Sequence, residues 1–194
     1  MKNRLAMAIR VLTIPPVMAL VLLTALYAAR REMIGSALNH ALAVVFLVIF
    51  PILAYPLQPL LPKLRRQGRE GQRNLATWMS FLGYVMGFVC ALILPVSGYL
   101  LAIYATYLLS GLTFVVLNKV FKFRASGHAC GVAGPIFTMI YFISPWLALV
   151  LLILPAVYWA SLTMGRHTKA ELIAGTAIPA CALFLSVLIF VGFR

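Results

Sequence analysis

Two short polar fragments in the second half of the chain contain the residue types best suited to chemistry on an anion. They cover residues 119–128 and 165–171, and together they hold two of the three histidines, five of the sixteen lysines and arginines, and one of the three acids. Each fragment stands at the beginning of a long apolar segment. Free amides at a helix start bind anions, and histidine transfers protons near neutral pH. The fragments therefore predict a phosphate site at the edge of a membrane.

The first fragment combines a helix-start signal with positive charge. Ser126 is a favoured N-cap residue, and Gly127 allows a ligand to approach the backbone closely. His128 follows directly and could give or take a proton. The cations that would neutralise phosphate oxygens stand just upstream: Lys119, Lys122 and Arg124. The alternative is a simple N-cap followed by a histidine at the membrane interface, with lysines that extend towards water.

The second fragment pairs His167 with Glu171, next to the guanidinium of Arg166. On a helix, a spacing of four residues puts both side chains on one face, where the carboxylate can orient the imidazole. The alternative is that Thr168 and Glu171 form a capping box, which would occupy the carboxylate at the helix start. Glu171 is the only acid after residue 70. An acid beside an apolar segment is costly, and this favours a functional role.

The elements that must position these fragments are apolar helices. Hydrophobic residues make up 64% of the 194 residues and charged residues 10%, with a mean hydropathy of +1.04. Such a composition predicts an all-α, polytopic transmembrane bundle of six to seven helices. The first segment follows Arg10 and is longer than a signal-peptide core, so we expect it to be retained. We predict seven apolar segments, at 11–29, 41–61, 75–94, 98–117, 128–144, 146–163 and 171–192.

The net charge of +13 does not indicate nucleic acid, because the basic residues cluster in the connections between apolar segments. The longest connection, Pro62 to Asn74, is interpreted as a topology signal that contacts anionic lipid. If the segments alternate sides, one face carries thirteen cations, including both fragments, and the other carries Arg30, Arg31 and Arg194. This count predicts that the two fragments share the cytoplasmic face of the cell membrane.

The two fragments resemble motifs of the type 2 phosphatidic acid phosphatase (PAP2) superfamily, namely K-x6-RP, PSGH and SR-x5-H-x3-D. Residues 125–128 match the second motif except at its proline, and residues 160–171 align with the third. There His167 is kept, Glu171 replaces the aspartate, and Ser161 stands where the motif has arginine. The first motif is represented by lysines and an arginine upstream of residue 125, without its spacing.

This resemblance implies a PAP2-like transmembrane domain over residues 40–194, preceded by an N-terminal membrane helix and connection over residues 1–39. It implies a membrane phosphatase that hydrolyses a lipid phosphate or a polyprenyl (di)phosphate and needs neither metal nor cofactor. His167 would attack phosphorus to form a phosphohistidine, Glu171 would orient it, and His128 would be the general acid and base. The equatorial oxygens would be held by a set of basic and backbone groups: Lys119, Lys122, Arg124, Ser126, Gly127 and Arg166.

Two alternatives stay open at this stage. A non-catalytic relative that binds or transports an anionic lipid would also fit the charge, and the arginine missing at Ser161 favours it. Many members of the superfamily carry the site on the extracytoplasmic face, whereas the charge count points to the cytoplasm. The sequence predicts membrane lipids and a lipid phosphate as partners, and it gives no oligomeric state.

Overall fold

The computed structural model describes residues 2–192, and this part of the chain consists of helices and short connections, with no strand. The prediction of an all-α bundle is therefore confirmed. Short π-helical or 3-10 turns continue several helices. The α-helices are α1 (Lys2–Leu12), α2 (Pro15–Ala29), α3 (Arg31–Ile34), α4 (Ala37–Val44), α5 (Phe50–Leu57), α6 (Pro62–Arg66), α7 (Gly68–Ile93), α8 (Gly98–Val115), α9 (Gly127–Phe142), α10 (Ile153–Thr163) and α11 (Lys169–Phe190).

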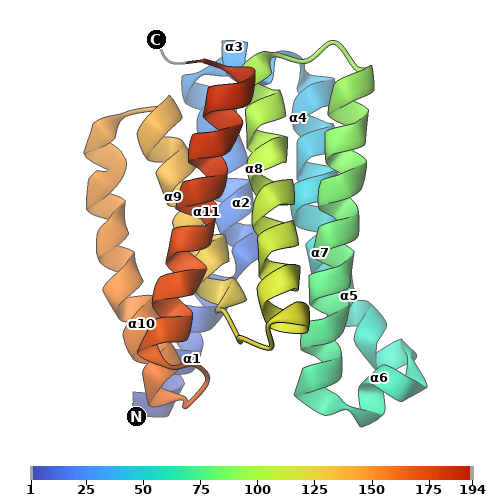
Figure 1. Ribbon diagram of the computed structural model, residues 1–194, viewed down its shortest axis with the longest axis vertical. Helices are drawn as coiled ribbons and strands as arrows, with labels where there is room; N and C mark the ends of the chain where they lie inside the picture. The colour runs from blue at the N-terminus through green and yellow to red at the C-terminus, as the bar shows by residue number, and fades with distance from the viewer. Residues whose placement is uncertain (1, 193–194) are drawn as a thin grey trace.

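Each predicted apolar segment corresponds to a helix or to a pair of consecutive helices. By length and composition five helices can cross a membrane, or six if α1 and α2, bent by 44° at Thr13–Ile14, form one span. Pro15 and Pro16 open α2, where a missing N–H costs nothing. α9 has only 16 residues and lies among the longer helices (Figure 1). The chain is therefore a multi-pass membrane protein.

The long polar connection between the second and third segments is not irregular. It forms the short helix α6 and then the first two turns of α7, so that Arg69 and Arg73 stand on the helix that continues into the membrane. The reason is local: Pro62 opens α6, and Gly68 has a left-handed φ of +55°, which ends one helix and begins the next.

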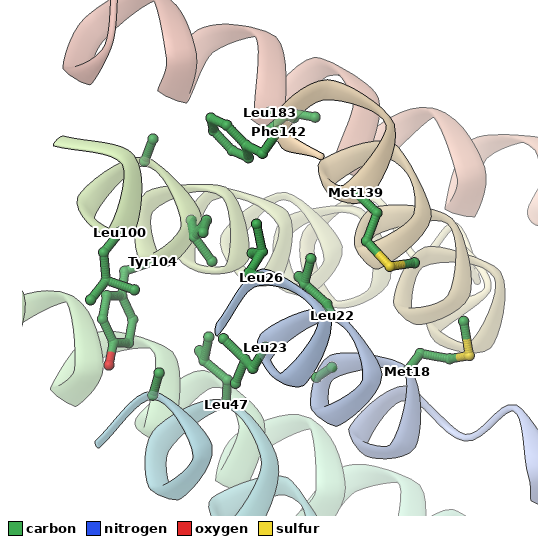
Figure 2. Packing of buried hydrophobic residues seen from close by; sticks show 14 of the residues in the cluster. Met18, Leu22, Leu23, Leu26, Leu47, Leu100, Tyr104, Met139, Phe142 and Leu183 are labelled. Atoms are coloured by element: carbon green, nitrogen blue, oxygen red, sulfur yellow. The ribbon is translucent and has the colours of Figure 1, made fainter. Parts of the chain in front are cut away.

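The core includes one face of α2, which lies near the centre of the bundle. Leu22, Leu23 and Leu26 are fully buried. In Figure 2 they point towards Leu47 and towards side chains of α8 and α9. Large apolar side chains on the outside are exposed instead, as with Trp146, which is 82% exposed. This distribution is expected where lipid, rather than water, covers the outer surface.

The two polar fragments lie at the same end of the bundle. In Figure 1 this is the lower end, which also carries α1 and α6, whereas α11 ends at the upper end. Arg30 and Arg31 lie at the opposite end, between α2 and α4, and Arg194 is outside the described residues. The large excess of basic side chains at the lower end is consistent with the charge asymmetry in the sequence.

Candidate functional site

The two fragments are joined directly by backbone contacts between the starts of α9 and α11. The Ser126 N–H donates to the Glu171 carbonyl over 2.9 Å, and the Ser126 hydroxyl accepts from the Ala129 N–H over 3.3 Å. Gly175 lies against the Ser126 carbonyl with no room for a side chain. Small residues allow helices to approach this closely. α11 therefore fixes where α9 begins, and with it the position of His128.

Glu171 holds His167 by a hydrogen bond, but the two residues do not lie on one face of the same helix. α11 begins at Lys169, so His167 precedes the helix and its N-cap, Thr168. The Glu171 carboxylate reaches back over the cap: Oε2 accepts from His167 Nδ1 over 2.9 Å and from the Thr168 N–H over 3.1 Å. Thr168 Oγ1 accepts from the Glu171 N–H over 3.3 Å, which completes a capping box.

The capping box and the imidazole contact are therefore compatible, because one carboxylate oxygen serves both. Since the carboxylate accepts only, the proton on the bond lies on Nδ1, which leaves the Nε2 lone pair of His167 for other chemistry. Burial lowers the pKa of His167, and the bond and charge of Glu171 oppose this lowering. A neutral imidazole with an orienting carboxylate is the form in which histidine acts as a nucleophile.

A Schellman turn at the end of α10 positions Arg166 and His167 in the cavity lining. Gly165 has a left-handed φ of +59°, which glycine adopts without strain. The Arg166 N–H donates to the Ser161 carbonyl over 3.0 Å and the Gly165 N–H to the Leu162 carbonyl over 2.9 Å. The sequence Gly165-Arg166-His167 thus ends α10 and places the Arg166 and His167 side chains in the cavity lining.

His128 is buried in the first turn of α9, with 9% of its surface exposed. Its Nε2 lies 3.0 Å from Thr13 Oγ1, in the bend between α1 and α2. The Thr13 hydroxyl already donates to the Ile9 carbonyl over 2.7 Å, so it can only accept from the imidazole. Thr13 therefore orients the ring and keeps the proton of neutral His128 on Nε2.

A cavity of about 680 Å³ opens at this end of the bundle and runs between α7, α8 and α9. Of the residues predicted from the two fragments, it is lined by Arg124, Gly127, His128, Arg166 and His167. Glu171 and Ser126 do not line the cavity. Glu171 contacts His167, which does, and Ser126 caps the start of α9.

The structure does not bring Lys119 and Lys122 into the cavity lining. The Lys119 ammonium donates to the Asn74 side chain of α7 over 3.0 Å, on the outside of the bundle. Lys122 is exposed and has a left-handed φ of +54°, in the turn that follows α8. The two lysines are therefore close to Ser126 in sequence but do not line the cavity with it, because the chain turns between residues 120 and 126.

Three cations that the fragments do not contain line the cavity instead: Arg10, Arg69 and Arg73. Arg69 and Arg73 come from the first turns of α7, within the connection interpreted as a topology signal, together with Glu70 at the exposed rim. Burial lowers the pKa of the Arg166 guanidinium, and the nearby charge of Arg69 adds to the effect. Nothing in the local sequence of these residues distinguishes them from ordinary topology charges.

Several polar atoms of the cavity are buried without a hydrogen-bond partner among the described residues. At the mouth these are the Nε atoms of Arg10 and Arg166, and deeper, on α8, the hydroxyls of Tyr107 and Ser110. Buried polar groups without partners are costly and are rare unless a ligand or water completes them. The arrangement is suited to an anionic group at the mouth and to a polar part of the ligand further in.

Comparison with protein-family models, with curated proteins and with solved structures gave no match to this chain. The functional interpretation therefore depends on the site geometry and on the resemblance of its two fragments to known motifs.

Proposed function

We propose that the chain is a membrane phosphatase of the PAP2 type that hydrolyses a lipid phosphate or a polyprenyl (di)phosphate through a phosphohistidine. One observation carries the proposal. A single cavity is lined by His167, whose Nδ1 is bonded to Glu171, by His128 and by arginine side chains from four parts of the fold. A nucleophile with its orienting carboxylate, a second proton-transfer group and a cationic oxyanion site are the parts that phosphoryl transfer requires.

In the first half of the reaction, His167 Nε2 attacks phosphorus while the bond to the leaving oxygen breaks. The new N–P bond puts positive charge on the imidazole, and the Glu171 carboxylate, 2.9 Å from Nδ1, stabilises it. His128 enters this step doubly protonated, beside the anionic phosphate. It gives its Nδ1 proton to the leaving oxygen and becomes the neutral imidazole whose Nε2–H is held by Thr13, so that the product leaves as an alcohol or as a lower phosphate.

In the second half, water attacks the phosphohistidine and gives a proton to His128. The N–P bond breaks, inorganic phosphate is released, and both histidines return to their starting states. Throughout, the equatorial oxygens are held by Arg124, Arg166 and the free amides at the start of α9, beginning at Gly127. Lys119 and Lys122 have no part in this assignment, because neither lines the cavity.

Lipid phosphate is the expected substrate class because the cavity opens at the end of an apolar bundle. A phosphate held there leaves the tail of its lipid beside the outer helices. We further propose that this end faces the cytoplasm, following the charge asymmetry. A cysteine introduced at Lys169, in a variant without Cys90, Cys130 and Cys181, should then resist an impermeant thiol reagent in intact cells. Labelling from outside would reverse the assignment.

The test of the function is phosphate release by the purified protein in detergent, supplied with phosphatidic acid or polyprenyl diphosphates. We expect release, its loss in His167→Ala, and retention in the matched control His40→Ala. His40 lies on α4 at the opposite end of the bundle, stacked on Tyr27 with ring centroids 4.5 Å apart.

A radiolabelled substrate should also leave an acid-labile label on the wild-type protein but not on His167→Ala. Tight binding of these lipids without release, in both the wild type and His167→Ala, would instead favour a lipid-binding protein or transporter.

A further inference from the structure

We propose that Arg10, on the first helix, is a phosphate-binding residue of this site and supplies the guanidinium that α10 lacks at Ser161. The inference rests on the proposed phosphatase function for the reaction, but the anion contact itself can be tested without turnover. It assigns a role to a residue that the sequence places among ordinary N-terminal topology charges.

The contact that carries the inference joins α1 to α10. Arg10 Nη1 donates to Ser161 Oγ over 2.6 Å, across 151 residues of sequence, and Ser161 is completely buried. The Ser161 carbonyl accepts from the Arg166 N–H at the same point. Ser161 is thus the link that brings two arginines together at the cavity mouth. Because the Arg10 guanidinium contacts the Ser161 side chain, it lies next to the place that an arginine side chain at position 161 would occupy.

The charges around Arg10 indicate an anion. Arg166 and Arg69 are close enough to act on it electrostatically, and all three line the cavity. Within residues 2–192 the one pair with salt-bridge geometry is His167–Glu171, so no carboxylate neutralises Arg10. Arg10 and Arg166 are partly buried, and clustered cations at such positions are unfavourable unless an anion joins them.

The donors of Arg10 are also incompletely used. A guanidinium has five N–H donors, and here the Nε–H is buried without a partner, as is that of Arg166. A phosphate between the two would accept from both forks at once, which is the geometry that arginine favours for phosphate.

The same stretch of chain also positions His128. Thr13 directly follows the helix that carries Arg10, and its hydroxyl lies 3.0 Å from His128 Nε2. The segment 9–13 therefore contacts α10 through Ser161 and α9 through His128. This makes the first helix part of the site rather than only a membrane anchor.

The experiment moves the guanidinium from α1 to α10. We expect Arg10→Ala to lower kcat/KM for phosphate release by roughly 10²- to 10³-fold, the usual cost of one oxyanion donor. Arg10→Ala combined with Ser161→Arg should regain most of this loss, because the charge returns to the same space from the other helix. Arg4→Ala, on the exposed face of α1, is the matched control and should behave as wild type. Wild-type activity in Arg10→Ala, or a double variant no better than Arg10→Ala, would overturn the inference.

A binding measurement separates this inference from the proposed function. Inorganic phosphate or vanadate should raise the unfolding temperature of the wild type and of His167→Ala, fail to do so in Arg10→Ala, and do so again in the double variant. If no variant releases phosphate from any lipid but this pattern holds, the phosphatase proposal fails and the Arg10 anion contact stands. Equal shifts in the wild type and Arg10→Ala would remove Arg10 from the site, whatever the activity. Unfolding temperatures without ligand identify a variant that is merely destabilised.

Discussion

Replacing Gly175 by alanine tests whether α11 sets the geometry of the site through the start of α9. A methyl group at this position would overlap the Ser126 carbonyl oxygen, and that oxygen is backbone, so it cannot rotate away. Relief requires the two helices to separate by about 1 Å to reach van der Waals contact. Because the Ser126 carbonyl also accepts from the Cys130 N–H, the displacement moves the first turn of α9 and His128 with it.

The expected cost of this change is of two kinds. Overpacking destabilises the fold by about 1–3 kcal/mol, measurable as a lower midpoint of thermal unfolding in detergent. A displacement of about 1 Å between His128 and His167 should lower kcat/KM by roughly 10²-fold, since catalytic groups act only from near-attack geometry. The measurement is phosphate release at several substrate concentrations, with the unfolding curve recorded on the same preparation.

Gly98→Ala is the matched control for Gly175→Ala. A methyl group on Gly98 would meet the Phe190 carbonyl at 2.5 Å, a backbone overlap of the same kind, at the end of the bundle opposite the site. We expect a similar loss of stability in both variants and a loss of kcat/KM only in Gly175→Ala. Full activity of Gly175→Ala, or an equal loss in Gly98→Ala, would refute the link between the α9–α11 contact and catalysis.

Three further predictions concern the groups around His167 and the inner cavity. Burial lowers the His167 pKa from its usual value of 6.5, and the nucleophile is the neutral imidazole. The pH profile of kcat/KM should therefore have an acidic limb, along which kcat/KM rises with pH, below pH 6.5. Glu171→Gln keeps the capping box but removes a negative charge that raises the His167 pKa. The acidic limb should therefore move to lower pH, and kcat should fall. An acidic limb that does not move would exclude His167 as the titrating group. Thr168→Ala should cost about 1 kcal/mol of stability and leave the limb in place. A limb that moves would show that the cap orients the carboxylate. Tyr107→Phe removes a buried hydroxyl without a partner, so the unfolding temperature should stay the same or rise while KM rises several-fold. An unchanged KM would show that this hydroxyl does not contact the substrate.

The sequence by itself determined the features that depend on neighbouring residues. Apolar runs of membrane-spanning length predict helices because an unsatisfied backbone is too costly in lipid, and each predicted run corresponds to helix. The Thr168–Glu171 capping box and the Ser126 cap are likewise local, since each joins residues three positions apart. For the same reason the His167–Glu171 contact was within reach of sequence reasoning, although its cause is the cap and not a helix face.

The tertiary structure decided which cations belong to the site. Lys119 and Lys122 are neighbours of Ser126 in sequence, yet the turn after α8 directs them away from the cavity. Arg10 is 151 residues from Ser161 and meets it only because α1 packs along α10. In a membrane protein, basic residues at helix ends follow from topology whether or not they bind a ligand, so their sequence positions do not distinguish the two roles. Only the packing of helices that are distant in the chain brings the arginines together around one cavity, and that packing depends on side-chain fit rather than on any local pattern.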